Sequence, residues 1–226
     1  MPKKELSEIC INTKNGNKET IRCKSLLRII PHKREVYDAI WQNKPVIAKI
    51  FLNRLQANRH LKREWDGLNT LQQLRLTSPS PLFFGTTDDG RSVLVTEKIT
   101  GSVSALDAFH NTADKEQKFK LLSIVCRELA KENQSGVLQK DLHLGNFLIK
   151  NDIVYALDVA QMHFLNHPLT KAQSISQLAF PVSHFADDTD AIKKLGVEYF
   201  NARDWQFEKS DEESLNSEIE IGRAHV

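Results

Sequence analysis

The chain has 226 residues, 40% of them apolar, and is therefore long enough to bury a sizeable core in one domain or two small lobes. Its three cysteines, Cys10, Cys23 and Cys126, lie far apart and are odd in number, which argues against a disulfide framework or a thiolate metal site. The first residues lack an apolar signal region, and no stretch approaches the roughly 18 apolar residues that span a bilayer. We therefore expect a globular protein that is cytoplasmic or peripheral to a membrane.

The net charge of +2 hides an uneven distribution along the chain. Residues 1–75 carry 16 Lys and Arg against 7 Asp and Glu, whereas the rest carries 15 against 22. A basic half suits phosphate-bearing ligands, nucleic acid or an anionic membrane surface, and ordinary solvated lysines explain it equally well. The aromatic interleaving that stacks on bases is absent, so we expect no nucleic-acid partner.

The first part of the chain has the pattern of a sheet with one helix. Alternating or short apolar runs predict strands at residues 19–30, 34–42, 45–52, 82–86 and 92–98. The run at 45–52 carries a single charge, Lys49, in its middle, which is unusual for a buried strand. Between these strands, apolar residues at helical spacing predict a helix over 56–76, and Glu64 lies among them.

The second part reads as mainly helical. Helical spacing predicts a helix over 115–133, and a further, mostly helical region over 165–220. Cys126 lies among apolar residues of the first of these helices, so we expect a buried, inert thiol. A loop and the short apolar run 153–157 lie between the helical regions. The order of elements predicts an α+β protein with a sheet-rich lobe, a hinge and a helical lobe.

The loop between the helical regions carries the residues with chemical potential. Asp141 and Asn146 stand five residues apart, the separation by which a kinase catalytic loop presents a base and a metal ligand to one site. Asp158 follows at the end of the apolar run. Phosphoryl transfer needs a cation on the phosphates, magnesium ligands and a carboxylate at the attacking hydroxyl, and these residues can supply them.

The residues Asp141-x-x-x-x-Asn146 and Asp158 resemble the protein-kinase superfamily. The segment Lys-Asp-Leu-His-Leu-Gly-Asn-Phe-Leu, residues 140–148, resembles the corresponding segment of lipopolysaccharide core kinases. These are bacterial enzymes that phosphorylate Kdo or heptose sugars. The likeness runs from about Leu26 to Asp158. It includes Val46-Ile-Ala-Lys49, which resembles the strand of the ATP-contacting lysine.

The resemblance implies a role for each matching residue. Lys49 would contact the α- and β-phosphates of ATP, Glu64 would orient Lys49, and the segment from Glu97 to Ile99 would be the hinge that holds adenine. In the second lobe it implies that Asp141 is the catalytic base and that Asn146 and Asp158 hold Mg²⁺, the cation that oxygen ligands suit.

A fold and a set of partners follow from the same resemblance. It implies a two-lobed protein-kinase-like α+β fold, with an ATP-binding lobe over residues 1–98 as an antiparallel sheet with one helix, and a mainly helical catalytic lobe over residues 99–219. ATP would bind in the cleft between the lobes. The acceptor would be a glycolipid or sugar. Apart from the resemblance, we expect a cytoplasmic monomer that can be peripheral on the cytoplasmic face of the inner membrane, since the basic lobe suits anionic lipid.

Several features depart from the protein-kinase pattern and leave alternatives open. The turn Pro31-His-Lys-Arg-Glu35 contains no glycine where protein kinases have a glycine-rich lid, so Lys33 or Arg34 is a candidate for meeting phosphate instead. Gln139-Lys140 replaces His-Arg, and Asp158-Val-Ala replaces Asp-Phe-Gly. A small-molecule or antibiotic phosphotransferase and a nucleotide-binding pseudokinase with a regulatory role remain alternatives.

The last seven residues, 220–226, match the translation of a common DNA-sequencing adapter. We interpret them as an artefactual tail, which predicts that the native C-terminus is lost and the helical lobe truncated.

Overall fold

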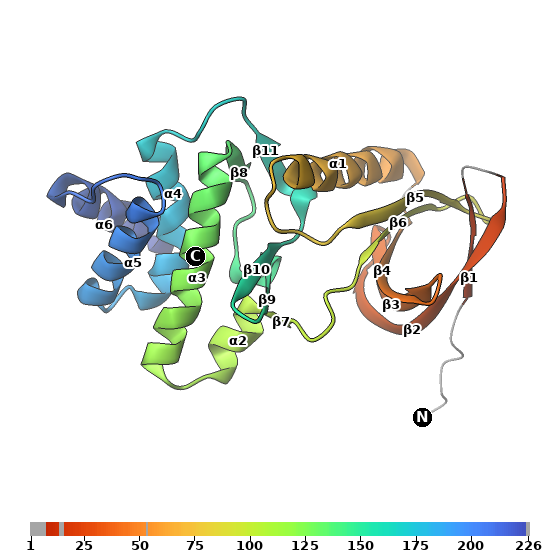
Figure 1. Cartoon of the computed structure of the whole chain (residues 1–226), viewed down its shortest axis with the longest axis horizontal. Coiled ribbons are helices and arrows are strands. Elements are labelled where there is room, and N and C mark those ends of the chain that lie inside the picture. The colour runs from red at the N-terminus through yellow and green to blue at the C-terminus, as the bar shows by residue number, and fades with distance from the viewer. Residues whose placement is uncertain (1–7, 14–15, 53, 225–226) are drawn as a thin grey trace. The chain divides into compact units, whose positions relative to one another are not determined.

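A computed structural model of the chain describes residues 8–13, 16–52 and 54–224 (Figure 1). It divides into two compact units, unit 1 with residues 1–73 and 78–100 and unit 2 with residues 74–77 and 101–226. Both units combine helix and strand, which confirms the predicted α+β class. None of the helices in the described ranges is long and apolar enough to cross a membrane.

Unit 1 is built on antiparallel strands that close into a barrel (Figure 1). The strands are β1 (Glu8–Asn12), β2 (Lys18–Ile30), β3 (Arg34–Trp41), β4 (Lys44–Phe51), β5 (Pro81–Thr87) and β6 (Ser92–Glu97), joined in the order β1-β2-β3-β4-β6-β5. Alternate side chains point inward, so Val46, Ala48 and Ile50 of β4 lie in the barrel core. Lys49 therefore lies on the opposite, outer face of β4.

The predicted antiparallel sheet is present in unit 1, and a further strand, β1, closes it into a barrel. Strand β1 was not predicted from the sequence; it pairs with β2 along its length and with β5 through Ile11 and Asn12. Its segment alternates as a strand should, with Ile9 and Ile11 buried and their neighbours exposed. Five residues are too short for such alternation to stand out in a sequence, and pairing with two neighbours stabilises the strand instead.

Helix α1 (Arg54–Gln73) contacts the outer faces of β4, β5 and β6. Its buried side chains recur every three or four residues, as an amphipathic helix requires: Ala57, Leu61, Glu64, Leu68 and Leu71. The helix ends three residues before the predicted Leu76. Arg75 adopts a left-handed φ of 59°, and Pro79 and Pro81 follow, so the chain cannot continue as a helix.

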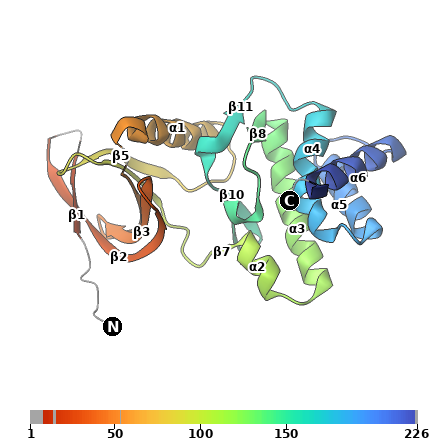
Figure 2. The same cartoon turned by 180° about the vertical axis from the view of Figure 1, so that it is seen from behind.

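In unit 2, helix α3 contacts α2, α4 and α5, and helix α6 packs on α4 (Figure 2). The helices are α2 (Ala105–Asn111), α3 (Lys115–Gln134), α4 (Lys171–Val182), α5 (Thr189–Asn201) and α6 (Lys209–Ala224). Short strands accompany them: β7 (Val103–Ser104), β8 (Val137–Gln139), β9 (Phe147–Lys150), β10 (Ile153–Ala156) and β11 (Met162–Phe164). Cys126 is fully buried in α3, and this burial raises the pKa of its thiol, in agreement with the expected inert cysteine. Of the predicted tail, residues 225–226 lie outside the described residues.

A buried polar network fastens the helices of unit 2 to one another. The Arg203 side chain is almost fully buried, and it donates hydrogen bonds to Gln134 Oε1, Ser174 Oγ and Leu169 O at 2.9, 2.7 and 3.0 Å. The Tyr199 hydroxyl donates to Asn133 Oδ1 at 2.5 Å. These bonds join α3, α4 and α5, so unit 2 holds these helices by directional contacts as well as by apolar packing.

Replacing Gly136 by alanine should destabilise unit 2 strongly. Gly136 has a φ of +79°, and a Cβ there would lie 2.6 Å from Leu165 O and 2.7 Å from His167 O. Gly101 has the same φ but no atom within 4 Å of that position. Urea unfolding should therefore show a loss of roughly 1 kcal/mol for Gly101→Ala, from the left-handed backbone alone, and of at least about 3 kcal/mol for Gly136→Ala. Equal losses would contradict the close approach.

Candidate functional site

An ion cluster lies between α1 and β4 in unit 1. Glu64 belongs to the buried stripe of α1, and its side chain is only 2% exposed. Lys49 Nζ, on the outer face of β4, donates to Glu64 Oε1, and Nη1 of Arg34 lies 3.7 Å from Glu64 Oε2. The pairing of Lys49 with Glu64 is the one that the family resemblance implies. Arg34 was predicted only as a candidate for meeting phosphate, and its contact with Glu64 was not.

Strand register explains why Arg34 reaches this cluster. In the β3–β4 ladder Val36 lies opposite Lys49, and Arg34 lies opposite Phe51. Arg34 is therefore the diagonal neighbour of Lys49 on the same face of the sheet, within reach of long side chains. Sequence spacing could not show this, because the register depends on how the β3–β4 hairpin closes.

The predicted adenine hinge, Glu97 to Ile99, lies at the end of β6. Glu97 is opposite Val46, three residues before Lys49 along the β4–β6 ladder. Its backbone N–H donates to Ser80 O at 2.9 Å, and the Ile99 side chain is buried. The segment thus lies on the same strand pair as Lys49, about 10 Å along it at the usual rise per residue. Its part in adenine binding stays a prediction.

In unit 2, one residue ties the three predicted site residues together. Asn146, in the 3₁₀ turn Leu144–Asn146, donates from Nδ2 to Asp141 O at 2.7 Å. Its own C=O accepts the backbone N–H of Leu157, the residue before Asp158, at 2.7 Å. The catalytic-type loop and the end of β10 are therefore joined through Asn146, while the Asp141 side chain is part of an exposed residue.

Asp158 has the backbone of a strained position. It adopts φ 52° and ψ 42° at the start of the 3₁₀ turn Val159–Gln161, and its side chain makes no capping hydrogen bond to that turn. A non-glycine residue in the left-handed region costs about 1–3 kcal/mol, and such positions cluster at functional sites. The Asp158 carboxylate therefore lies just after strand β10 and makes no capping hydrogen bond to the turn that follows it.

The side chains of Asn146 and Asp158 offer oxygen atoms, the donor type that magnesium takes. Because Nδ2 of Asn146 is used on Asp141 O, its Oδ1 is the atom left to act as a ligand. Mg²⁺ is usually held by one or two carboxylates together with substrate phosphates, and here Asp158 would supply the carboxylate and Asn146 a neutral amide oxygen. In the part of the chain that the structure describes, no three His, Cys, Asp or Glu side chains gather as a metal cluster.

The buried carboxyl of Glu132 is linked by a hydrogen bond to the start of the Asp141 loop. This contact was not predicted from the sequence. Glu132 of α3 is fully buried, and Gln139, two residues before Asp141, donates from Nε2 to its Oε2 at 2.5 Å. Gln139 also exchanges two backbone hydrogen bonds with the Gln177 side chain of α4, both at 3.0 Å. Burial raises the pKa of Glu132 from 4.5 to about 8, and Glu128 adds to this rise. Glutamate side chains in helices are mostly exposed, so the sequence did not indicate that Glu132 is buried.

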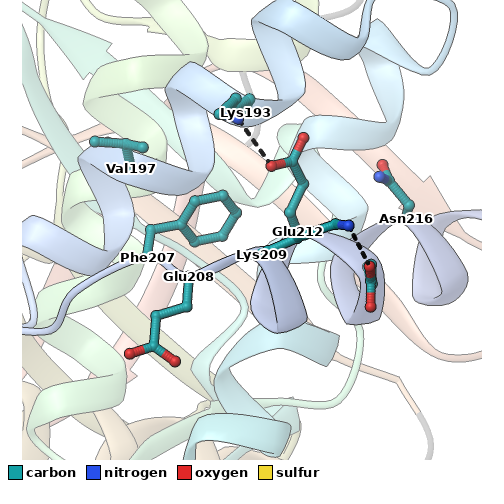
Figure 3. A pocket seen from close by; sticks show the side chains of 8 residues that line it. Lys193, Val197, Phe207, Glu208, Lys209, Glu212 and Asn216 are labelled. Carbon is teal, nitrogen blue, oxygen red and sulfur yellow. Dashed lines mark ion pairs between the residues drawn. The ribbon is translucent and has the colours of Figure 1, made fainter.

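A separate hollow of about 470 Å³ lies beside α5 and α6 (Figure 3). Val197 and Phe207 line it together with two ion pairs, Lys193 with Glu212 at 3.0 Å and Lys209 with Glu213 at 3.7 Å. None of the predicted site residues lines this hollow. Glu208 lines it as well, so its lining holds one carboxylate more than the two lysines pair with.

The residue types found in the two units are those that kinases use. A model of the lipopolysaccharide kinase (Kdo/WaaP) family matches residues 30–175. The match covers more than half of the chain and includes every predicted site residue, and the chain therefore belongs to this family of kinases. This confirms the resemblance to lipopolysaccharide core kinases. None of the curated proteins matches the chain.

The buried carboxyl of Glu132 should make stability depend on pH. Its pKa is about 8 in the folded protein and ordinary when unfolded, so the folded state holds the extra proton between these values. The stabilisation is present at low pH and is lost as pH rises from about 4.5 through 8. Glu132→Gln should flatten this fall and be more stable than the parent above pH 8. Unfolding midpoints from pH 5 to 9 test this, with Glu116→Gln, an exposed position of the same helix, as the control. A parallel pH profile for parent and Glu132→Gln would refute it.

Proposed function

We propose that the chain is an ATP-dependent kinase that transfers the γ-phosphate to a sugar hydroxyl of the lipopolysaccharide inner core, on Kdo or heptose. Family membership supports the reaction class. The observation that carries the proposal is the pair of hydrogen bonds through which Asn146 joins the Asp141 loop to the residue before Asp158. A base and two oxygen ligands on one hydrogen-bonded framework suit phosphoryl transfer.

Asp141 is the general base of the proposed reaction. Its carboxylate accepts the proton of the sugar hydroxyl while the hydroxyl oxygen bonds to the γ-phosphorus and the bond to the ADP oxygen breaks. A positioned base typically contributes about 10² to 10⁴-fold to the rate. The Asn146 side chain, bonded to the backbone of Asp141, holds the loop from which this carboxylate projects.

Unit 1 supplies the nucleotide contacts in this proposal. Lys49 binds the α- and β-phosphates, Glu64 orients Lys49, and the backbone from Glu97 to Ile99 holds adenine. The buried carboxylate of Glu64 limits the lysine to few orientations, because a buried charge must stay paired. A fixed cation stabilises the phosphate charge without reorganisation during the reaction.

Mg²⁺ is the proposed cofactor, with Asn146 and Asp158 as its protein ligands. When bound, the ion neutralises charge on the β- and γ-phosphate oxygens. The chain's own contribution is to hold both oxygen ligands on the framework described above. Contact with an anionic membrane would bring the enzyme to a glycolipid acceptor, and the basic first part of the chain suits that contact.

Replacing Asp141 by asparagine should abolish transfer while leaving the fold intact. We expect label from the γ-phosphate of Mg·ATP to appear in dephosphorylated lipopolysaccharide core with the parent, and to fall by about 10² to 10⁴-fold with Asp141→Asn, because the base is lost. Asp152→Asn, an exposed carboxylate in the next hairpin, is the control and should retain activity. Label in an aminoglycoside instead of the core would favour a small-molecule phosphotransferase. ATP binding without transfer to any acceptor would favour the pseudokinase.

The activity should also require Mg²⁺ held through Asn146. Chelation with EDTA should stop transfer, and Asn146→Ala should raise the Mg²⁺ concentration for half-maximal rate by roughly tenfold or more, because one oxygen ligand is lost. Asn201→Ala, an exposed position of α5, is the control. An unchanged magnesium requirement in Asn146→Ala would show that this residue does not hold the ion.

A further inference from the structure

The ion cluster of unit 1 contains two cations and one carboxylate. Lys49 and Arg34 both approach Glu64, and their side chains are each 17% exposed, whereas Glu64 is 2% exposed. The cluster therefore carries one positive charge more than its carboxylate neutralises. Such an excess in a partly dehydrated place attracts an anion, since Coulomb interactions there are weakly screened.

Hydrogen bonding within the cluster is incomplete on the arginine side. Among the residues that the structure describes, Nε of Arg34 is buried and has no hydrogen-bond partner, and the same holds for Oε2 of Glu64. The 3.7 Å from Arg34 Nη1 to Glu64 Oε2 is an ion pair but too long for a hydrogen bond. A buried donor without an acceptor costs about 1–3 kcal/mol, so the guanidinium is poised for a ligand that brings acceptor oxygens.

The turn before Arg34 does not offer the backbone donors of a glycine-rich phosphate loop. In the turn of residues 31–33, the N–H of Lys33 already donates to Ile30 O at 3.0 Å. His32 occupies a left-handed φ of 59° with a full side chain, so the backbone is also less approachable than at glycine. Pro31 has no N–H to donate, so this turn has few backbone donors and its side chains are the main source of phosphate contacts.

We propose that Arg34, together with Lys49, forms the binding site for the polyphosphate of the nucleotide and takes the place of the missing glycine-rich lid. This inference rests on the proposed function, because it names the residue that meets the phosphates of the same substrate. The planar guanidinium presents donors in a fork that matches phosphate oxygens, and Glu64 holds it beside Lys49. Arg34 is thus a substrate-binding residue, and Glu64 positions both cations.

The test is a comparison of ligands that contain and lack phosphate. Binding of Mg·ATP, inorganic tripolyphosphate and adenosine is measured by calorimetry for the parent, Arg34→Ala and Arg34→Lys. Arg22→Ala serves as the control, since it removes the same charge from an exposed position of β2 that pairs with Ile40, away from Lys49. Arg34→Ala should weaken ATP and tripolyphosphate at least tenfold and adenosine less than twofold. Arg34→Lys should recover part of this loss, and the control should stay within twofold of the parent.

The binding and transfer results together separate this inference from the proposed kinase function. If Arg34→Ala binds ATP as the parent does, or loses ATP and adenosine equally, Arg34 does not bind phosphate and the inference is overturned, while the proposed kinase function stands. If the parent binds tripolyphosphate through Arg34 but transfers no phosphate from ATP, the inference stands and the proposed function fails. If the parent binds neither ATP nor tripolyphosphate, both are overturned.

Discussion

The buried carboxylate of Glu64 is the constraint on which the arrangement of unit 1 depends. Helix α1 covers the barrel with an apolar stripe, and Glu64 stands in the middle of that stripe at 2% exposure. A charge so far from water is tolerated only beside opposite charge, so α1 must pack where Lys49 faces outward from β4. One carboxylate thereby sets the register of the helix on the barrel and, with it, the direction of both cations of the cluster.

Unit 2 solves a similar problem with neutral groups. The loop after β8 carries the exposed residue Asp141. Two hydrogen bonds hold this loop: Asn146 Nδ2 donates to Asp141 O, and Gln139 Nε2 donates to Glu132 Oε2. Glu132 avoids the cost of buried charge by remaining protonated, because burial raises its pKa to about 8. The proposed chemistry in both units thus depends on buried polar groups whose partners come from another element of the same unit.

The sequence predicted the elements that periodicity governs and missed those that depend on register. Strand β4 with its single Lys49, helix α1 with Glu64 and the Asp141 loop could be read from spacing, since each pattern lies within one segment. Strand β1 was too short to recognise. The approach of Arg34 to Glu64 and the bond between Gln139 and Glu132 join segments far apart or across a turn, and only strand pairing and helix packing bring them together. The family resemblance added the roles of the residues, which spacing alone does not supply.

The central claim is that residues of both units serve one phosphoryl transfer. Rates of transfer from Mg·ATP to dephosphorylated lipopolysaccharide core should be compared for the parent, Lys49→Met, Asp141→Asn and the double variant. Residues that act as a unit have strongly non-additive effects. The account predicts that each single change reduces the rate by at least about 10²-fold and that the double variant is hardly slower than the slower single one. Retained transfer in either single variant, or losses that multiply fully in the double variant, would contradict it.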